Sequence, residues 1–333
     1  MSRNTTPRST KGTANKTASN ESVPTAQPDQ RTNNTHSQPF FPFARYTSIV
    51  GVHTSLLSFT ALFLPRTSLS SLSQGLFLSL NNPSDDSSRD SPPPTLTESP
   101  LRTVAWLCAG TFILQIWWAG WVRGWSLDTR DLSKGGAALE RTEQKLQRQT
   151  WNSGRFAAFK TACLLTAVAS FFFAIVALLF GAPVFSHFLQ TYLLGLLVAL
   201  LTVFTPAYTL GAPSFKTDIV SLVTRLTWIR LFAEISPRSP VERAVVYPAV
   251  GAFLGCWSGA IPAGLDWEEP WQRWPLTTSY GALGGFVIGS LSAFGVSALE
   301  NLANFDRQSR VSMSPSGSAH SPQGKGSKKL KSQ

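Results

Sequence analysis

Apolar residues in this chain gather into long stretches that contain no Asp, Glu, Lys or Arg. A helix rises about 1.5 Å per residue, so about 20 apolar residues cross a hydrocarbon core about 30 Å thick. Most of the stretches have that length. The longest can cross twice, because Gly181-Ala182-Pro183 interrupts it. The charge-free stretches are 46–65, 103–122, 161–215, 244–265 and 274–299.

This pattern predicts an all-α, polytopic membrane protein with about six transmembrane helices. Buried helices of a soluble protein usually keep one polar face, whereas the segment 161–180 carries no charge on any face. The segment 67–84 is also uncharged, but its serines and Gln74-Gly75 favour an interfacial or re-entrant stretch, with a seventh span as the alternative. The predicted spans lie near 46–64, 102–122, 161–180, 188–210, 245–265 and 276–298, within a membrane domain of residues 45–299.

Composition separates two polar tails from this apolar middle. Only 14% of all residues are charged, against about 25% in a typical soluble protein. The segments 1–44 and 300–333 are poor in apolar residues, and such segments cannot bury enough apolar surface to fold. We therefore expect two disordered tails.

The 29 Lys and Arg residues alternate between the segments that connect the spans. If both termini are cytosolic, the cytosolic segments carry 6, 8, 5 and 6 of them and the opposite segments carry 3, 0 and 1. Lys and Arg stay on the cytosolic side during insertion, so this orientation is predicted. The net charge of +11 follows from topology, and no nucleic-acid partner is expected. Four glycosylation sequons are then predicted to stay unused, at Asn4, Asn15, Asn20 and Asn33.

The C-terminal residues contain a possible sorting signal. Lys329 and Lys331 have the spacing of dilysine signals, which return membrane proteins to the endoplasmic reticulum (ER). A solvated basic tail is the alternative, since Lys325 and Lys328 lie nearby. We expect residence in the ER membrane.

Ionisable side chains that could support catalysis are rare. His53 lies inside a predicted span, and the spans contain no carboxylate. On the predicted non-cytosolic side, His187 could join Asp266, Glu268 and Glu269 as metal ligands or as acid and base, but no metal-binding spacing is present. These acids alternate with tryptophans typical of a membrane interface, Trp267, Trp271 and Trp274. No catalytic, cofactor-binding or metal-binding residue is predicted.

Two rows of glycine recur at intervals of four residues in the last two predicted spans. Residues four apart share one helical face, so each row leaves a groove that admits a neighbouring backbone. The rows can pack on each other or on a partner protein, and the sequence leaves both possibilities open. The rows are Gly251, Gly255 and Gly259, and Gly281, Gly285 and Gly289.

The segment 216–234 has apolar residues at helical spacing, flanked by Arg225. This pattern predicts an amphipathic helix on the cytosolic membrane surface. Its apolar residues are Ile219, Leu222, Val223, Leu226, Ile229 and Phe232.

Two motifs lie near each other in the second half of the chain, ER-x-x-x-YP-x-x-G and LDW-x-x-PWQ-x-WP. The first comprises Glu242, Arg243, Tyr247, Pro248 and Gly251, and the second comprises Asp266, Trp267, Pro270, Trp271, Trp274 and Pro275. Both motifs resemble those of the PIG-F family of glycosylphosphatidylinositol (GPI) anchor biosynthesis. The similarity covers about 45–298 and is clearest after 179.

The resemblance implies a multi-pass ER protein that binds and stabilises the large transferases of GPI synthesis. These enzymes add ethanolamine phosphate from phosphatidylethanolamine to mannose of the GPI precursor, and they carry the metal-dependent catalytic domain. The implied partners are such catalytic subunits and membrane lipid, and no cofactor or catalytic residue is implied here.

Two other classes remain open. A lipid transporter or flippase would use broken helices, which Pro206 and Pro262 could provide. A lipid-modifying membrane enzyme would need a buried acid or base, for which His53 is the candidate.

Overall fold

The computed structural model describes residues 42–66, 96–133, 154–183, 187–214, 216–265 and 269–313. Six helical segments are long and apolar enough to cross a membrane, and the described residues contain no strand. This confirms the expected all-α class with about six candidate membrane-spanning helices in the described part of the chain. They are Phe43–Arg66, Pro100–Thr129, Arg155–Leu179, Phe188–Leu210, Pro240–Gly264 and Leu276–Arg310.

Short helical elements complete or connect these spans. In chain order the elements are α1 (Phe43–Phe63), η1 (Leu64–Arg66), α3 (Pro100–Ser133), α5 (Arg155–Leu179), α6 (Phe188–Ala199), η3 (Leu200–Phe204), α7 (Thr205–Leu210), α8 (Ile219–Trp228), η4 (Ile229–Ala233), α9 (Pro240–Ser258), η5 (Pro262–Gly264), η6 (Pro270–Gln272) and α10 (Leu276–Met313).

Proline changes the fourth span without breaking it. Pro206 has no N–H, and in an α-helix its ring would collide with the carbonyl group of Thr202. The preceding segment η3 has wider, π-helical turns, which accommodate such a ring. The chain then continues as α7 to Gly211, whose φ of +91° ends the helix. In the fifth span, α9 ends before Pro262.

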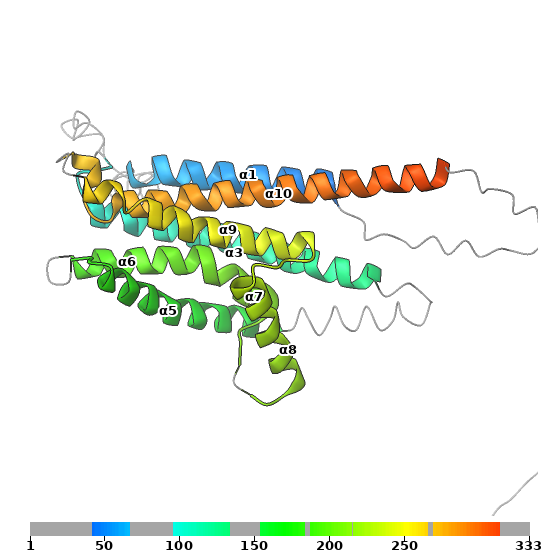
Figure 1. Ribbon diagram of the computed structural model, residues 1–333. Coiled ribbons are helices and arrows are strands. Elements are labelled where there is room, and N and C mark those ends of the chain that lie inside the picture. Colours follow the sequence, from blue (N-terminus) through cyan, green and yellow to red (C-terminus); the bar gives the residue numbers. More distant parts are fainter. Residues whose placement is uncertain are drawn as a thin grey trace, which may run out of the picture. The chain divides into compact units, whose positions relative to one another are not determined.

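The long helices lie side by side (Figure 1). The α5–α6 and α9–α10 connections mark one side of the bundle, called here the loop side. The start of α1 and the end of α10 mark the opposite, tail side. The most extensive contacts join α9 to α10 and α5 to α6, while α1 packs on α10 and α3. The bundle thus contains two closely packed hairpins, α5–α6 and α9–α10.

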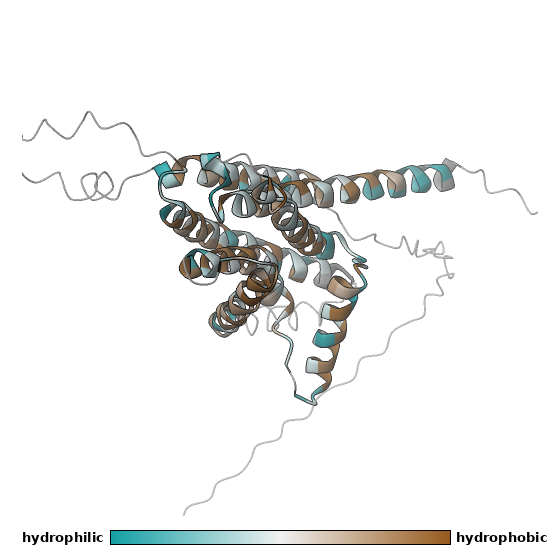
Figure 2. Ribbon diagram, turned by 60° about the vertical axis from the view of Figure 1, so that its left-hand side comes forward, coloured by the Kyte–Doolittle hydropathy of each residue, from teal (hydrophilic) through white to brown (hydrophobic). Residues whose placement is uncertain are grey.

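The two helices of the α5–α6 hairpin differ in burial. The span that contains α6 is the most buried of the six, whereas α5 is the least buried. On α5, the apolar side chains of Phe171, Phe172 and Ile175 are exposed. Hydrophobic residues dominate the bundle, and hydrophilic ones recur where α10 projects beyond it (Figure 2). Such an apolar exterior suits lipid or an apolar partner and does not suit water.

Helix α10 extends beyond the predicted end of the membrane domain. We expected a disordered tail from residue 300, whereas α10 continues to Met313. Extending an existing helix requires no new nucleation, and an i,i+4 ion pair joins Arg310 to Asp306 at 2.9 Å. Composition averaged over 300–333 concealed this helical segment. The segment 67–84 and the tail lysines lie outside the described residues.

The predicted helix within 216–234 is confirmed by α8 and η4. It lies on the tail side and runs across the direction of the long helices (Figure 1). No residue of α8 is buried, and its apolar stripe, including Leu222 and Leu226, is exposed. The Trp228 indole N–H donates to the Gly211 carbonyl oxygen at 3.0 Å, which attaches the end of α8 to the preceding link.

Candidate functional site

The two glycine rows meet each other at the α9–α10 contact, called here the glycine seam (Gly251, Gly255, Gly259, Gly281, Gly285 and Gly289). A Cβ atom added to Gly255 would lie 2.9 Å from the Cα of Gly285, closer than real Cβ atoms approach any neighbour. A Cβ on Gly281 would lie 3.1 Å from the Cα of Gly259. Of the two arrangements that the sequence left open, the structure has the rows packed on each other. These faces are therefore covered within the chain.

The tail-side end of this hairpin is held by the first motif. Arg243 is almost fully buried, and its guanidinium donates to the Ser297 hydroxyl oxygen at 3.1 Å and to the carboxylate of Glu300. Both partners belong to α10, so Arg243 ties α9 to α10. At the seam itself, a Cβ on Gly289 would meet the Cα of Pro248 at 2.9 Å. The motif therefore contributes both polar ties and close backbone contact.

Glu242 ties α9 to the preceding link. Its carboxylate accepts two hydrogen bonds from the Arg230 guanidinium, at 3.1 and 2.5 Å, and one from the Arg238 backbone N–H at 2.6 Å. The hydrogen bond to this carboxylate raises the pKa of Arg230 above its usual value. The Ser239 hydroxyl caps the helix by accepting from the Glu242 N–H at 3.2 Å. Glu242 thus ties α9 to the segment that precedes it, and the adjacent Arg243 ties α9 to α10.

The second motif forms a braced connection on the loop side. The Gln272 amide donates to the carbonyl oxygens of Pro262 and Leu265, at 2.8 and 2.9 Å, and its oxygen accepts from the Glu269 N–H at 3.0 Å. The Trp274 indole N–H donates to the Thr191 hydroxyl at 3.0 Å, which joins the connection to α6. The motif residues Asp266 and Trp267 lie outside the described residues.

His53, the histidine predicted inside a span, lies in the interior of the helical bundle. His53 is fully buried and stacks on Trp118, with ring centroids 4.8 Å apart. Among the described residues, its ring nitrogens have no hydrogen-bond partner, and no three His, Cys, Asp or Glu residues gather as metal ligands. Asp266 and Glu268 lie outside this part, so the absence of a catalytic or metal site stays a prediction.

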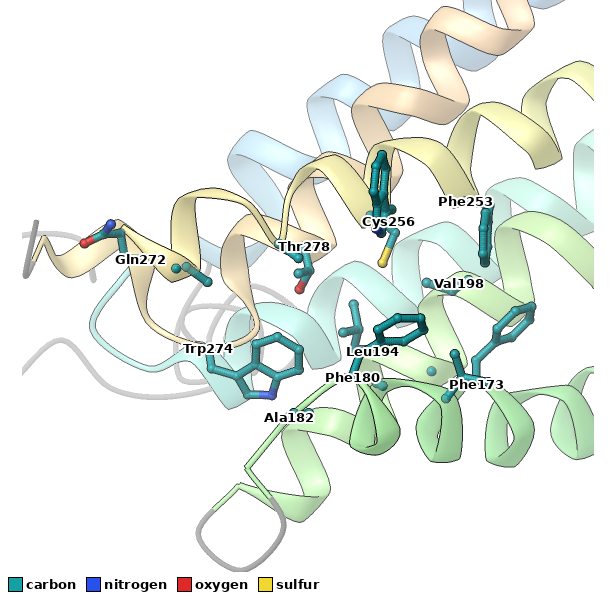
Figure 3. A pocket seen from close by; sticks show the side chains of 18 residues that line it. Phe173, Phe180, Ala182, Leu194, Val198, Phe253, Cys256, Gln272, Trp274 and Thr278 are labelled. Carbon is teal, nitrogen blue, oxygen red and sulfur yellow. The ribbon is translucent and has the colours of Figure 1, made fainter. Parts of the chain in front are cut away.

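A pocket of about 520 Å³ opens on the loop side between the two hairpins (Figure 3). Phe173 and Phe180 line it from α5 and its end, Leu194 and Val198 from α6, and Phe253 from α9. Sequence reasoning missed this pocket, because its lining residues come from four helices and have no common spacing.

These features define a polytopic helical membrane protein with a glycine-packed hairpin and a polar brace at each end of that hairpin. A model of the "GPI biosynthesis protein family Pig-F" matches residues 92–294. The chain belongs to the PIG-F family.

Relatives in fungi and animals support this assignment. A human protein named "GPI ethanolamine phosphate transferase, stabilizing subunit" is 31% identical over 41% of this chain and 58% of its own length. "Glycosylphosphatidylinositol anchor biosynthesis protein 11" of Debaryomyces hansenii is 31% identical over 51% of this chain and 68% of its own. The protein of that name in Pyricularia oryzae is 38% identical over 38% and 42%. The chain spans about half the length of the curated relatives it matches. No solved structure matches it.

Proposed function

We propose that this chain is a non-catalytic subunit that binds and stabilises an ethanolamine-phosphate transferase of GPI synthesis in the ER membrane. The observation that carries the proposal is the family match over 92–294, joined to the printed name of the human relative. The described charged motif residues agree with it, because Glu242 and Arg243 bind other parts of the same chain. They are occupied in holding helices together.

The exterior of the bundle offers a physical route to stabilisation. Helix α5 is strongly apolar and largely unburied, so it can pack along a membrane helix of a partner. A subunit that binds only the folded partner stabilises it by mass action, by about 2.7 kcal/mol at 100 times the dissociation constant. We expect the level of the transferase to fall when this chain is absent. Affinity purification in mild detergent followed by mass spectrometry should recover the transferase with the full chain, and failure to recover any such enzyme would contradict the proposal.

Both termini are placed in the cytosol under this proposal, so the loop side faces the ER lumen. The support is the alternation of the 29 Lys and Arg residues between the connecting segments. The four N-terminal sequons should then carry no glycan, whereas a sequon introduced at 85–90 should be glycosylated and serves as the positive control. A glycosidase-sensitive mass shift that maps to the native N-terminal sequons would overturn this topology.

Catalysis is assigned to the partner, and the carboxylates of the α9–α10 connection test that assignment. Changing Asp266 to Asn and both Glu268 and Glu269 to Gln removes every acid of this connection at nearly constant size. Transfer of ethanolamine phosphate should remain largely intact. The comparison uses variants matched for expression and complex recovery. A carboxylate variant that assembles normally but abolishes transfer would place this connection in the active site.

A further inference from the structure

The pocket arises because two hairpins are packed tightly within themselves and loosely against each other. A Cβ on Gly195 of α6 would lie 2.6 Å from the Ser170 carbonyl oxygen and 2.8 Å from the Ala174 nitrogen of α5, so these helices touch through their backbones. The glycine seam does the same for α9 and α10. The contact between α6 and α9 is far smaller. A space of about 520 Å³ remains between the hairpins on the loop side, within the range of about 300–1,000 Å³ for ligand sites.

The walls of the pocket offer apolar surface and few free polar atoms. No charged residue is among the described residues that line it. Three of its polar side chains, Gln272, Trp274 and Thr278, already bond to the protein. The Gln272 amide and the Trp274 indole make the bonds given above, and the Thr278 hydroxyl donates to the Pro275 carbonyl oxygen at 2.7 Å. Phe173, Phe180 and Phe253 supply much of the remaining wall (Figure 3). The matching ligand is therefore apolar.

The surroundings of the pocket identify the kind of apolar ligand. Most of its lining residues belong to four of the six described segments that are long and apolar enough to span a membrane, so most of its wall lies at the depth of bilayer hydrocarbon. An empty apolar space forfeits dispersion contacts on every wall, and water gains too few hydrogen bonds there to fill it. The hydrocarbon chain of a lipid can enter from the bilayer, makes dispersion contacts with the apolar walls and needs no hydrogen bonds.

Arg273 offers a cation next to pocket-lining residues in the chain. It is exposed and lies in the sequence between two of them, Gln272 and Trp274. Its guanidinium donates one long hydrogen bond, 3.3 Å, to the Thr97 carbonyl oxygen. A guanidinium has five N–H donors in a planar fork that suits phosphate. The neighbouring carboxylate of Glu269 accepts from the Gln272 backbone N–H, so it is engaged within the connection.

We propose that this pocket binds one acyl chain of a membrane phospholipid, with the lipid phosphate at Arg273. The site is separate from the glycine seam and does not depend on the proposed role toward a transferase. It gives the chain a specific lipid ligand on the side of the bundle that holds the braced connection.

A photoactivatable lipid tests the proposal on the intact protein. The full chain is reconstituted in phosphatidylcholine vesicles that contain phosphatidylcholine with a diazirine in one acyl chain, and labelled residues are mapped by mass spectrometry. We expect labels to concentrate on pocket residues such as Leu194, Val198 and Cys256. Labelling spread evenly over the outer face of α5, including Phe171 and Leu179, would overturn the proposal.

Pocket-filling variants sharpen the test. Ala177→Phe places a ring among the lining residues, and Ala167→Phe makes the same change at an exposed position of α5 that does not line the pocket. We expect at least a fivefold loss of pocket labelling in the first and none in the second. If Ala177→Phe misfolds by gel filtration, Ala263→Phe fills the same pocket from η5. Unchanged labelling of the pocket in a folded Ala177→Phe or Ala263→Phe variant would refute lipid binding. If such a variant also fails to recover the transferase while its labelling is unchanged, the pocket would be assigned to a helix of the partner instead.

Arg273→Gln tests the head-group contact. We expect it to reduce labelling by the diazirine phospholipid at least threefold, with little effect on labelling by a diazirine fatty alcohol that has no phosphate. Equal effects on both lipids, or no effect on either, would refute the assignment of the phosphate to Arg273.

Discussion

Replacing Gly285 by alanine adds one methyl group at a point where the backbones of α9 and α10 are in direct contact. The new Cβ would lie 2.9 Å from the Gly255 Cα and 2.8 Å from the Gly251 carbonyl carbon. Carbon atoms pack best at about 3.5–4.0 Å, so these two contacts alone require the helices to separate by about 0.7 Å, and the Gly251 carbonyl oxygen lies closer still. Backbone cannot rotate away as a flexible side chain can, and the shift is therefore transmitted along the seam.

The neighbouring Gly284 gives a matched control on the same helix. A Cβ added there meets no atom within 4 Å. Both substitutions gain about 0.5–1 kcal/mol of helix propensity, but only Gly285→Ala adds the overpacking cost of about 1–3 kcal/mol. The difference between the two variants therefore isolates the seam contribution. At about 2–4 °C per kcal/mol for 150–250 residues, we expect Gly285→Ala to melt about 2–12 °C below Gly284→Ala.

The assay is thermal unfolding of both variants in the same detergent, followed with a thiol-reactive dye. Cys108 is buried, and Cys163 and Cys256 are partly buried, so unfolding exposes reactive thiols. Equal melting temperatures for the two variants would show that the close α9–α10 approach does not limit stability. Gly255→Leu and Gly285→Leu should act more strongly. In cells they should reduce recovery of the complex and of the transferase, and GPI precursors lacking the terminal ethanolamine phosphate should accumulate.

Arg243→Met should lower the melting temperature by several degrees, because it removes buried hydrogen bonds worth about 1–3 kcal/mol. Arg310→Met should have little effect, because its ion pair is exposed, and equal effects of the two variants would contradict this ranking. Replacing Lys329 and Lys331 with Ser should let part of the protein reach the Golgi, as seen by microscopy, and unchanged localisation would count against a retrieval signal. A cysteine placed at Leu226 in a cysteine-free chain should resist an impermeant maleimide in permeabilised cells, while one on the polar face of α8 should react. Rapid labelling of both would contradict a membrane-surface position for this helix.

The sequence was sufficient to identify a polytopic membrane protein, because a helix that crosses the bilayer requires a continuous apolar segment. A span needs about 20 apolar residues, so six spans could be located by counting along the chain. The spacing of apolar residues in 216–234 predicted a helix for the same reason, since 3.6-residue periodicity is local. The four-residue repeat of glycines showed which faces could approach a backbone, but it carried no information about the partner face.

Which surfaces meet is seen in the three-dimensional structure and could not be read from the sequence. The contact of Gly255 with Gly285, the tie from Arg243 to Ser297 and the bond from the Thr205 hydroxyl to the Gln115 amide oxygen, 2.7 Å long, join residues that are 30 to 90 positions apart. Such pairings depend on how whole helices cross, and helix crossing is set by the sum of many weak contacts. The pocket shows this dependence most clearly. It lies where the α5–α6 and α9–α10 hairpins pack loosely against each other, and no local sequence pattern specifies the space between them.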